Sequence, residues 1–432
     1  MSRNYRIVRL AGLHTPEADR HILQAVPVFK ELSYHDQMEE LFKLRYVYSD
    51  SFSRAMRQLG HDAYDIVWDF DLVQRQWAQE HDVDCQSENW QSTVLLEQIK
   101  ALRPDVVYFQ GTELAIPGRV SKTRNSLNWL SVLSGEVPSI KLIAMYSGFP
   151  SRSDRLNGVD LLFSGPPDVC KHYKQQGFQP ILCYHAFDEE VLKDLSDVAI
   201  SKEEEVTTRQ LTFVGSARAP ESRYWILRQL LAGGNLQAWV DEPDVFHHQG
   251  DRSRILESLA DGGRVWCHKV TTDKLGREGQ GLFGKIIQKH SIRRQVDRFL
   301  KAKTLAELFP GQCHDAVLGL DYYQTIQNSL ITFNRHTDYV SDSVGNMRMF
   351  EATGVGACLL TDAGSNLGDL FLEDYEVATY CSIDEAIEKS KFLIENEDKR
   401  KELAMKGQAR TLRDHTTRNR CDLIDEVIQS AI

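Results

Sequence analysis

The chain has 432 residues, 42% of them hydrophobic and 26% charged, with a formal net charge of −11. This length predicts two domains of ordinary size, and the acidic balance excludes nucleic acid as a main partner, because phosphate binding favours a basic surface. Apolar runs stop short of the ~20 residues that a membrane-spanning helix needs, so no such segment is expected.

The first half of the chain alternates short apolar runs with helical patterns. Residues 5–12 are expected to form a strand rather than a signal peptide, and a long helical pattern follows over about 35–59. It ends at Gly60, which suits the position after a helix because glycine adopts positive φ freely. Further strands are expected at 64–68, 106–110, 140–148, 159–165 and 180–187. Further helices are expected at about 90–102, 119–134 and 167–177.

A charged, partly helical stretch at 188–209 separates this pattern from a second alternation of the same kind. There, strands are expected at 210–216, 236–240, 329–334, 356–362 and 375–381. Helices are expected at 221–232, 252–260 and 319–328, and one more contains Glu351. Two further helices are expected between the last strand and about residue 413, and a final helix over 417–432. Near-continuous apolar strands that alternate with helices indicate parallel sheets with helices on both faces.

The sequence therefore predicts two doubly wound, Rossmann-like α/β domains in tandem. The expected boundaries are 1–190 for the N-terminal domain, 191–209 for a connector, 210–415 for the C-terminal domain and 416–432 for a last helix. An irregular basic insertion is expected within the second domain at 262–315. In open parallel sheets, ligands bind beyond the carboxyl ends of the strands, so residues that follow predicted strands are candidates for a site.

The segment 342–351 is the richest of these candidates. A helix that begins there, with Asp342 or Ser343 as N-cap, would present free N–H groups to a phosphate. Arg348 could add a charge-assisted bond to a diphosphate, and the carboxylate of Glu351 could accept two neighbouring hydroxyls, as a ribose presents them. The spacing of three residues equally allows Arg348 and Glu351 to pair only with each other on a helix surface.

The motif NMRMFEATGVGACLLTD (346–362), with ITFNRH upstream and NLGDLF downstream, resembles the signature of the CgeB-like, spore-maturation-type glycosyltransferases. Similar motifs recur in the same order over nearly all of 210–421, whereas the N-terminal half matches only in outline. This resemblance implies the GT-B fold, in which two Rossmann-like doubly wound domains face each other across a cleft. The second domain would hold a nucleotide sugar and the first an acceptor. Gly354 and Gly356 would let the helix pack closely on the next strand.

The resemblance also implies roles for individual residues. Glu351 would take the ribose hydroxyls. The residues expected near the diphosphate are Gly215, Ser216, Asn346 and Arg348. Other residues expected to contribute to the donor site are Arg218, Lys285, Asn334, His336 and Ser343. Ser343 stands where many retaining enzymes of this fold carry a second glutamate, so the sequence leaves retention or inversion open.

A basic stretch at 284–303 interrupts an otherwise acidic chain. Its simplest interpretation is a solvated helix face, and the alternative is a docking surface for an anionic acceptor or for the inner face of a membrane. The segment 279–286, GQGLFGKI, matches phosphate-loop patterns, but no strand precedes it and Ile286 stands where such a loop needs Ser or Thr. We expect a chance match, although Lys285 could still reach a donor phosphate.

An inverting transfer needs a base that takes the proton of the acceptor hydroxyl. Glu113, His14 and His185 each follow a predicted strand and are the candidates, although each also has an ordinary structural explanation. No D-x-D cluster suggests a metal site, so we expect metal-independent activity. No cofactor is expected beyond the nucleoside-diphosphate sugar that serves as donor substrate.

The sequence thus predicts a cytoplasmic hexosyl- or deoxyhexosyltransferase that moves a sugar from a nucleoside diphosphate to a glycan acceptor. The expected pathway is the synthesis of a surface polysaccharide or glycoconjugate, with the protein free in the cytoplasm or peripheral to the inner face of the membrane. The eight scattered cysteines lack a C-x-x-C pair and fit reduced thiols. Two alternatives stay open: a nucleotide-sugar epimerase of the same fold, and a non-catalytic subunit that binds a sugar nucleotide.

Overall fold

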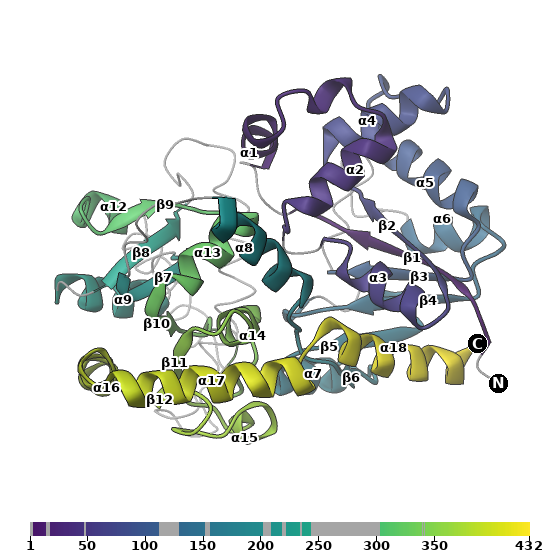
Figure 1. The fold of residues 1–432 in the computed structure, drawn as a ribbon. Coiled ribbons are helices and arrows are strands. Elements are labelled where there is room, and N and C mark those ends of the chain that lie inside the picture. Colours follow the sequence, from purple (N-terminus) through teal and green to yellow (C-terminus); the bar gives the residue numbers. More distant parts are fainter. Residues whose placement is uncertain are drawn as a thin grey trace, which may run out of the picture.

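The structure is a computed structural model. It describes residues 3–13, 18–46, 49–111, 129–151, 156–201, 209–217, 222–233, 236–242, 303–338, 340 and 342–432. These residues form two α/β domains, each built on a six-stranded sheet whose neighbouring strands all pair in parallel (Figure 1).

The first sheet has the order β2-β1-β3-β4-β5-β6. Its strands are β1 (Arg6–Ala11), β2 (Asp62–Val67), β3 (Val106–Gln110), β4 (Leu142–Tyr146), β5 (Leu161–Ser164) and β6 (Ile181–Leu182). Its helices are α1 (Ala18–Ala25), η1 (Phe29–Glu31), α2 (Tyr34–Lys43), α3 (Ser51–Gln58), α4 (Asp71–Glu80), α5 (Trp90–Leu102), α6 (Trp129–Glu136) and α7 (Pro167–Gln175). Side chains of α5, α6 and α7 bury one face of the sheet. Burial of both faces explains why the strands are almost continuously apolar.

The second sheet has the order β12-β11-β10-β7-β8-β9. Its strands are β7 (Arg209–Ser216), β8 (Leu236–Asp241), β9 (Cys313–Asp315), β10 (Ser329–Asn334), β11 (Cys358–Asp362) and β12 (Ala378–Tyr380). Its helices are α8 (Glu190–Ser201), α9 (Ser222–Ala232), α12 (Leu305–Leu308), α13 (Gly319–Gln327), α14 (Met347–Gly354), α15 (Leu367–Leu370), α16 (Ile383–Glu395) and α17 (Glu397–Asp414). Helices α9 and α16 pack on one face, and α8, α13 and α14 pack on the other.

The single helix expected over 35–59 is wrong, because two helices, α2 and α3, occupy this stretch. Arg45 adopts a φ of 53°, which ends α2, and its Nε donates to the Asp194 carboxylate at 2.5 Å. The apolar spacing continues through the break because Tyr46 is also buried, and this continuity hides the turn from a periodicity argument. Gly60 follows α3 with a φ of 96°, as expected for the residue after a helix.

The end of the expected basic insertion belongs to the second sheet. Residues 303–315 were expected to be irregular, but they include α12 and β9, and β9 pairs with β8. Thr304 caps α12 through a reciprocal pair of hydrogen bonds with Glu307. The rest of the insertion lies outside the described residues.

The C-terminal helix α18 (Thr417–Ala431) returns to the first domain. Figure 1 shows α17 beneath the second domain and α18 beneath the first. Cys421, Ile424 and Ile428 of α18 are buried against Phe52 and Met56 of α3, and together they cover the second face of the first sheet. Among the residues that the structure describes, no helix is both long and apolar enough to cross a membrane.

The chain passes between the domains twice at one place. The N–H of Phe187 donates to the carbonyl of His415 at 2.9 Å, and the N–H of Thr417 donates to the carbonyl of Phe187 at 2.9 Å. The imidazole of His415 donates to the carbonyl of Leu370 and accepts from Arg420. Burial lowers the pKa of His415 to about 4, so the ring is neutral at this crossing.

Candidate functional site

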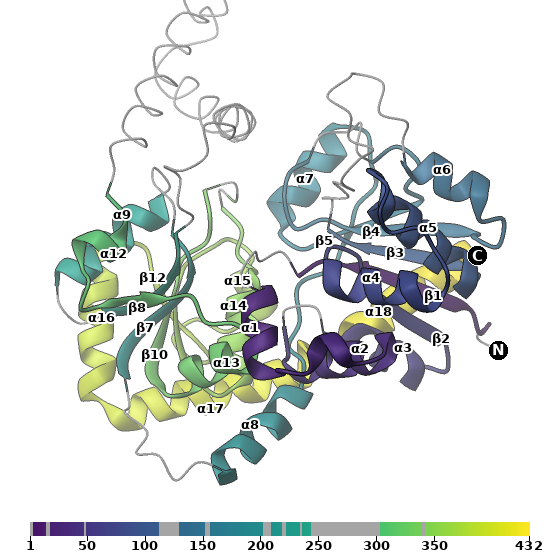
Figure 2. The ribbon, with the colours of Figure 1, turned by 90° about the horizontal axis from the view of Figure 1, so that it is seen from above.

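Four segments of the second domain meet at the carboxyl ends of its strands. Strands β7 and β10 end at Ser216 and Asn334, and helices α13 and α14 begin at Gly319 and Met347. Parallel strands place these ends at one edge of the sheet, where ligands bind in open α/β folds. Figure 2 shows α13, α14 and α15 on the side of the second domain that faces the first.

Glu351 lies on α14 and is only 6% exposed. Its Oε2 accepts a hydrogen bond of 2.5 Å from the hydroxyl of Tyr322 on α13. Its Oε1 accepts no hydrogen bond from the described residues. These residues do not fully enclose Oε1, so it remains open to a ligand. Burial raises the pKa of Glu351 above its ordinary value, although the Tyr322 bond and the charge of Arg348 oppose this shift.

Arg348 lies in the first turn of α14, with its guanidinium carbon 4.8 Å from the centre of the Phe213 ring. Its Nη1 donates to Asn334 Oδ1 at 3.3 Å, and its Nε is enclosed without a hydrogen-bond partner. Its Nη2 lies against Gly215, where a Cβ atom would come within 2.0 Å of it. Gly215 also has a φ of 143°, so glycine is required for conformation, and a Cβ atom there would displace the Arg348 guanidinium.

In the described part of the chain, Arg348 and Glu351 form no direct ion pair with each other. Instead, Glu351 Oε2 accepts from the Tyr322 hydroxyl, and Arg348 Nη1 donates to Asn334 Oδ1. Burial, followed by the charge of Glu351, raises the pKa of Tyr322 well above its ordinary range, so the phenol stays protonated and donates. The alternative in which the two charges merely satisfy each other is therefore not what the structure shows.

Two asparagines fix the start of α14. Asn346 Nδ2 donates to Asn334 Oδ1 at 2.8 Å, and Asn334 Nδ2 donates back to Asn346 Oδ1 at 3.1 Å. Asn334 Nδ2 also donates to Thr361 Oγ1 at 2.9 Å. Because the fully buried Asn334 amide is satisfied within the protein, it aligns α14 with β10 and β11.

His336 holds the loop before α14. Its Nδ1 lies 2.8 Å from Asp362 Oδ1, and its Nε2 accepts the N–H groups of Gly345 and Asn346 at 3.0 and 3.2 Å. These contacts require the neutral imidazole with its proton on Nδ1. Burial alone would raise the pKa of Asp362, but His336 and Arg335 outweigh it and keep the pKa below its ordinary value.

The expected N-cap is wrong. Helix α14 begins at Met347, with Asn346 as an extended N-cap that makes no side-chain cap hydrogen bond. Gly345 has a φ of 135°, which turns the chain just before the helix and separates it from the polar residues at 342–343. Ser343 contacts the first domain instead: its N–H donates to the Asp168 carboxylate at 3.1 Å, and its Oγ accepts the N–H of Asp168 at 3.3 Å.

The glycines near the end of α14 also differ from expectation. A Cβ atom at Gly354 would lie 2.4 Å from the ring of Phe187, so this glycine admits the interdomain crossing rather than the next strand. Gly356 has a φ of 81° and supplies the turn into β11. Both glycines are therefore required, the first for space and the second for conformation.

Ser216 is held by a residue that the sequence did not indicate. Arg223, in the first turn of α9 and 6% exposed, donates to the Ser216 carbonyl at 3.2 Å and to the Arg335 carbonyl at 2.7 Å. It thereby ties the end of β7 to the end of β10. Tyr322 was missed as well, and the only available signal was its place in the first turn of the expected helix at 319–328.

Of the three candidate bases, the structure describes His185. It follows β6, and its Nε2 lies 3.1 Å from the hydroxyl of Tyr146. Burial, followed by the charge of Arg420, lowers the pKa of His185 to about 4, so it is neutral near pH 7. Among the described residues, no hydrogen bond or ring contact joins it to Arg348 or Glu351. The other two candidate bases, His14 and Glu113, lie outside the described residues. So do the expected donor-site residues Arg218 and Lys285 and nearly all of the basic stretch 284–303.

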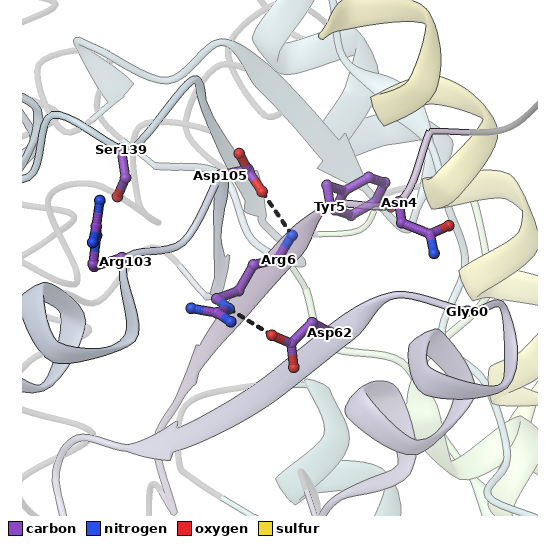
Figure 3. A pocket seen from close by; sticks show the side chains of 8 residues that line it. All are labelled: Asn4, Tyr5, Arg6, Gly60, Asp62, Arg103, Asp105 and Ser139. Atoms are coloured by element: carbon purple, nitrogen blue, oxygen red, sulfur yellow. Dashed lines mark hydrogen bonds and ion pairs between the residues drawn. The ribbon is translucent and has the colours of Figure 1, made fainter.

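A pocket of about 520 Å³ lies at the opposite, amino-terminal edge of the first sheet (Figure 3). Arg6 Nε donates to Asp62 Oδ2 at 2.6 Å across it, and the Arg6 N–H donates to Asp105 Oδ2 at 2.8 Å. Lys141 pairs with the other oxygen of Asp105 at 2.6 Å. These charges satisfy one another, and the pocket lies away from the carboxyl edge where sheet ligands bind. In the described part of the chain, no three His, Cys, Asp or Glu side chains are grouped to hold a metal ion.

Comparison with known proteins identifies the fold. Residues 288–426 match the family model described as glycosyl transferase-like, whereas no curated protein matches the sequence. The crystal structure of Anabaena HepE in complex with UDP-glucose is similar over 99% of this chain and 100% of that one, with 12% identity and a TM-score of 0.52.

Two further solved structures agree. Sucrose-phosphate synthase from Thermosynechococcus elongatus aligns over 99% of both chains, with 8% identity and a TM-score of 0.52. The catalytic domain of Starch Synthase IV from Arabidopsis thaliana, bound to ADP and acarbose, aligns over 99% of both chains, with 11% identity and a TM-score of 0.51. The chain therefore has the GT-B fold, and the predicted fold class is confirmed.

Proposed function

We propose that this protein is a glycosyltransferase that transfers a sugar from a nucleoside diphosphate to a glycan acceptor. One observation carries the proposal. At the carboxyl edge of the second sheet, the buried carboxylate of Glu351 keeps one oxygen free, and the guanidinium of Arg348 lies against Gly215 at the end of β7. The glycosyl transferase-like match over 288–426 covers α13, α14 and Glu351. HepE, with the same fold, was crystallised with UDP-glucose.

Each group then has a chemical role in binding the donor. Glu351 Oε1 accepts the ribose hydroxyls, because a carboxylate oxygen can receive two donors. Arg348 Nη2 and the backbone at Gly215 contact the diphosphate, with the first N–H groups of α14 adding partial positive charge. As the glycosidic bond breaks, negative charge develops on the leaving diphosphate, and Arg348 stabilises it.

The first domain would bring the acceptor to this edge. His14, Glu113 and His185 are the proposed bases for its hydroxyl proton. We further propose that the reaction needs no divalent metal, that the enzyme is a CgeB-like hexosyl- or deoxyhexosyltransferase, and that its product is a surface polysaccharide or glycoconjugate. The proposed setting is the cytoplasm or the inner face of the membrane, with the basic stretch 284–303 as contact surface.

The decisive experiment begins with binding. Thermal unfolding is followed with a panel of nucleoside diphosphates, and a ligand at 100 times its Kd should stabilise the protein by ~2.7 kcal/mol. The matching sugar nucleotide is then incubated with and without glycan acceptors, and products are separated by mass and stereochemistry. Acceptor-dependent glycan extension supports the proposal. Conversion of the donor alone into an epimer, or binding without turnover across acceptors, would replace it with one of the two alternatives.

A further inference from the structure

We infer that Tyr322 is a positioning residue for the donor: it holds one oxygen of Glu351 so that the other faces a ribose 2′,3′-diol. The inference rests on the proposed function and deepens it, because it names the donor class. A carboxylate fixed in this way recognises a ribonucleoside diphosphate and discriminates against its 2′-deoxy counterpart.

The contacts of Glu351 are asymmetric. Oε2 accepts the 2.5 Å hydrogen bond from Tyr322, and Oε1 stays open although the residue is 94% buried. Rotation about the last bond of a glutamate side chain is otherwise broad and weakly restricted. A single fixed donor on one oxygen therefore determines where the other oxygen points.

Tyr322 also gives Glu351 a partner other than Arg348. Arg348 and Glu351 are three residues apart on α14, a spacing at which opposite charges commonly pair directly. Such a pair would occupy the guanidinium and the carboxylate together. Because Glu351 Oε2 accepts from Tyr322 instead, Arg348 keeps Nη2 against Gly215, and Glu351 keeps Oε1 for hydroxyls.

The phenol is itself held firmly. Tyr322 is in the first turn of α13, which packs against α14, and its ring contacts that of Tyr323 edge to face with centroids 5.2 Å apart. The Leu320 N–H, in the same turn, donates to the Leu44 carbonyl of the first domain at 3.1 Å. The hydroxyl that orients Glu351 therefore belongs to a turn anchored by both domains.

The test compares Tyr322→Phe with the matched control Tyr323→Phe. The control removes the hydroxyl of the next residue, Tyr323, which forms no hydrogen bond to Glu351 within the described part of the chain. Calorimetry measures Kd for UDP or ADP, whichever stabilises the wild type, and for the 2′-deoxy form of the same nucleotide. We expect the wild type to prefer the ribonucleotide by about tenfold.

Tyr322→Phe should weaken ribonucleotide binding by about tenfold and 2′-deoxynucleotide binding by less than about twofold, so that the preference disappears. Tyr323→Phe should retain both values. Equal losses for both nucleotides in Tyr322→Phe would show a purely structural role, and an unchanged preference would show that Glu351 needs no positioning. Either result overturns the inference while the proposed function stands. A wild type that binds no nucleoside diphosphate overturns both.

A second readout separates positioning from folding. The Tyr322 hydrogen bond lowers the pKa of Glu351, so its removal should raise that pKa further. In Tyr322→Phe, ribonucleotide binding should therefore be lost at a higher pH than in the wild type as the pH falls. Identical pH midpoints in the two proteins would contradict the inference.

Discussion

Glu351 and Arg348 show how far residue types reveal a site. Two charges in an apolar helix followed by glycines predict a ligand near the helix start, and their free atoms fit that prediction. The partner of Glu351 could not be predicted in the same way. Tyr322 lies 29 residues away on another helix, and only packing brings it to the carboxylate. The roles of these residues in donor binding stay predictions.

Glu351→Gln should weaken binding of the nucleoside diphosphate by about tenfold or more, since a neutral amide oxygen accepts hydroxyls less strongly than a carboxylate. The amide oxygen can still accept from Tyr322, so the fold should remain. Calorimetry and thermal unfolding measure both properties. Glu388→Gln, at an exposed position of α16, is the control and should bind as the wild type does. Wild-type affinity in Glu351→Gln would exclude this residue from the site.

The raised pKa of Glu351 gives affinity and stability opposite pH dependences. As the pH falls through this pKa, the carboxylate becomes protonated and affinity for the donor should decrease. The folded protein binds this proton more tightly than the unfolded chain does, so the contribution of Glu351 to stability is greatest at low pH. That contribution is lost as the pH rises from the ordinary glutamate pKa through the raised one. Titrations of Kd and Tm in the wild type and Glu351→Gln test both signs.

At the scale of elements, periodicity predicted most helices and strands but not their ends. The turn at Arg45 and the start of α14 depend on backbone conformations that a hydrophobic pattern does not record. Helix α13 is the most informative element, because its first turn carries Tyr322 and meets the first domain. Gly319 makes that meeting possible, with a φ of 58° and the Leu44 carbonyl beside it.

Gly319→Ala should therefore affect two properties together. Its Cβ would come within 2.1 Å of the Leu44 carbonyl oxygen, so the contact between α13 and the first domain must open. We expect a loss of about 1–3 kcal/mol in unfolding free energy and a severalfold weaker donor affinity, measured by urea unfolding and calorimetry. Gly311→Ala, where a Cβ would meet nothing within 4 Å, should change neither. Loss of stability with full affinity would show that α13 does not couple the domains to the site.

At the scale of the whole molecule, both sheets follow from the alternating pattern, and their relation does not. Ser343 and Asp168 are 175 residues apart in the chain, and Thr417 and Phe187 are 230 apart. Nothing in the local sequence indicates that these residues meet. The last helix was expected over 416–432 without a docking position, and its buried face lies on the first domain.

Ile424→Ala should show which domain depends on α18. Ile424 is 3% exposed in the core of the first domain, and removal of its buried atoms should cost about 2–4 kcal/mol of unfolding free energy. Nucleoside diphosphate affinity should stay within about twofold, because the proposed donor site belongs to the second sheet. Chemical denaturation and calorimetry measure the two effects. Asp422→Asn, at a neighbouring position, is the control and should be nearly neutral, as exposed charge changes usually are.

The return of α18 makes the first domain mechanically continuous from one terminus to the other. Near the chain ends, the Arg3 N–H donates to Gln429 Oε1 at 3.0 Å, and Gln429 Nε2 donates to the Arg3 carbonyl at 2.8 Å. The second domain is thus inserted between two chain segments that pair with each other at Phe187 and Thr416. A pull applied to both termini would load the first domain and peel α18 away, while the second domain would stay outside the line of force until that crossing parted.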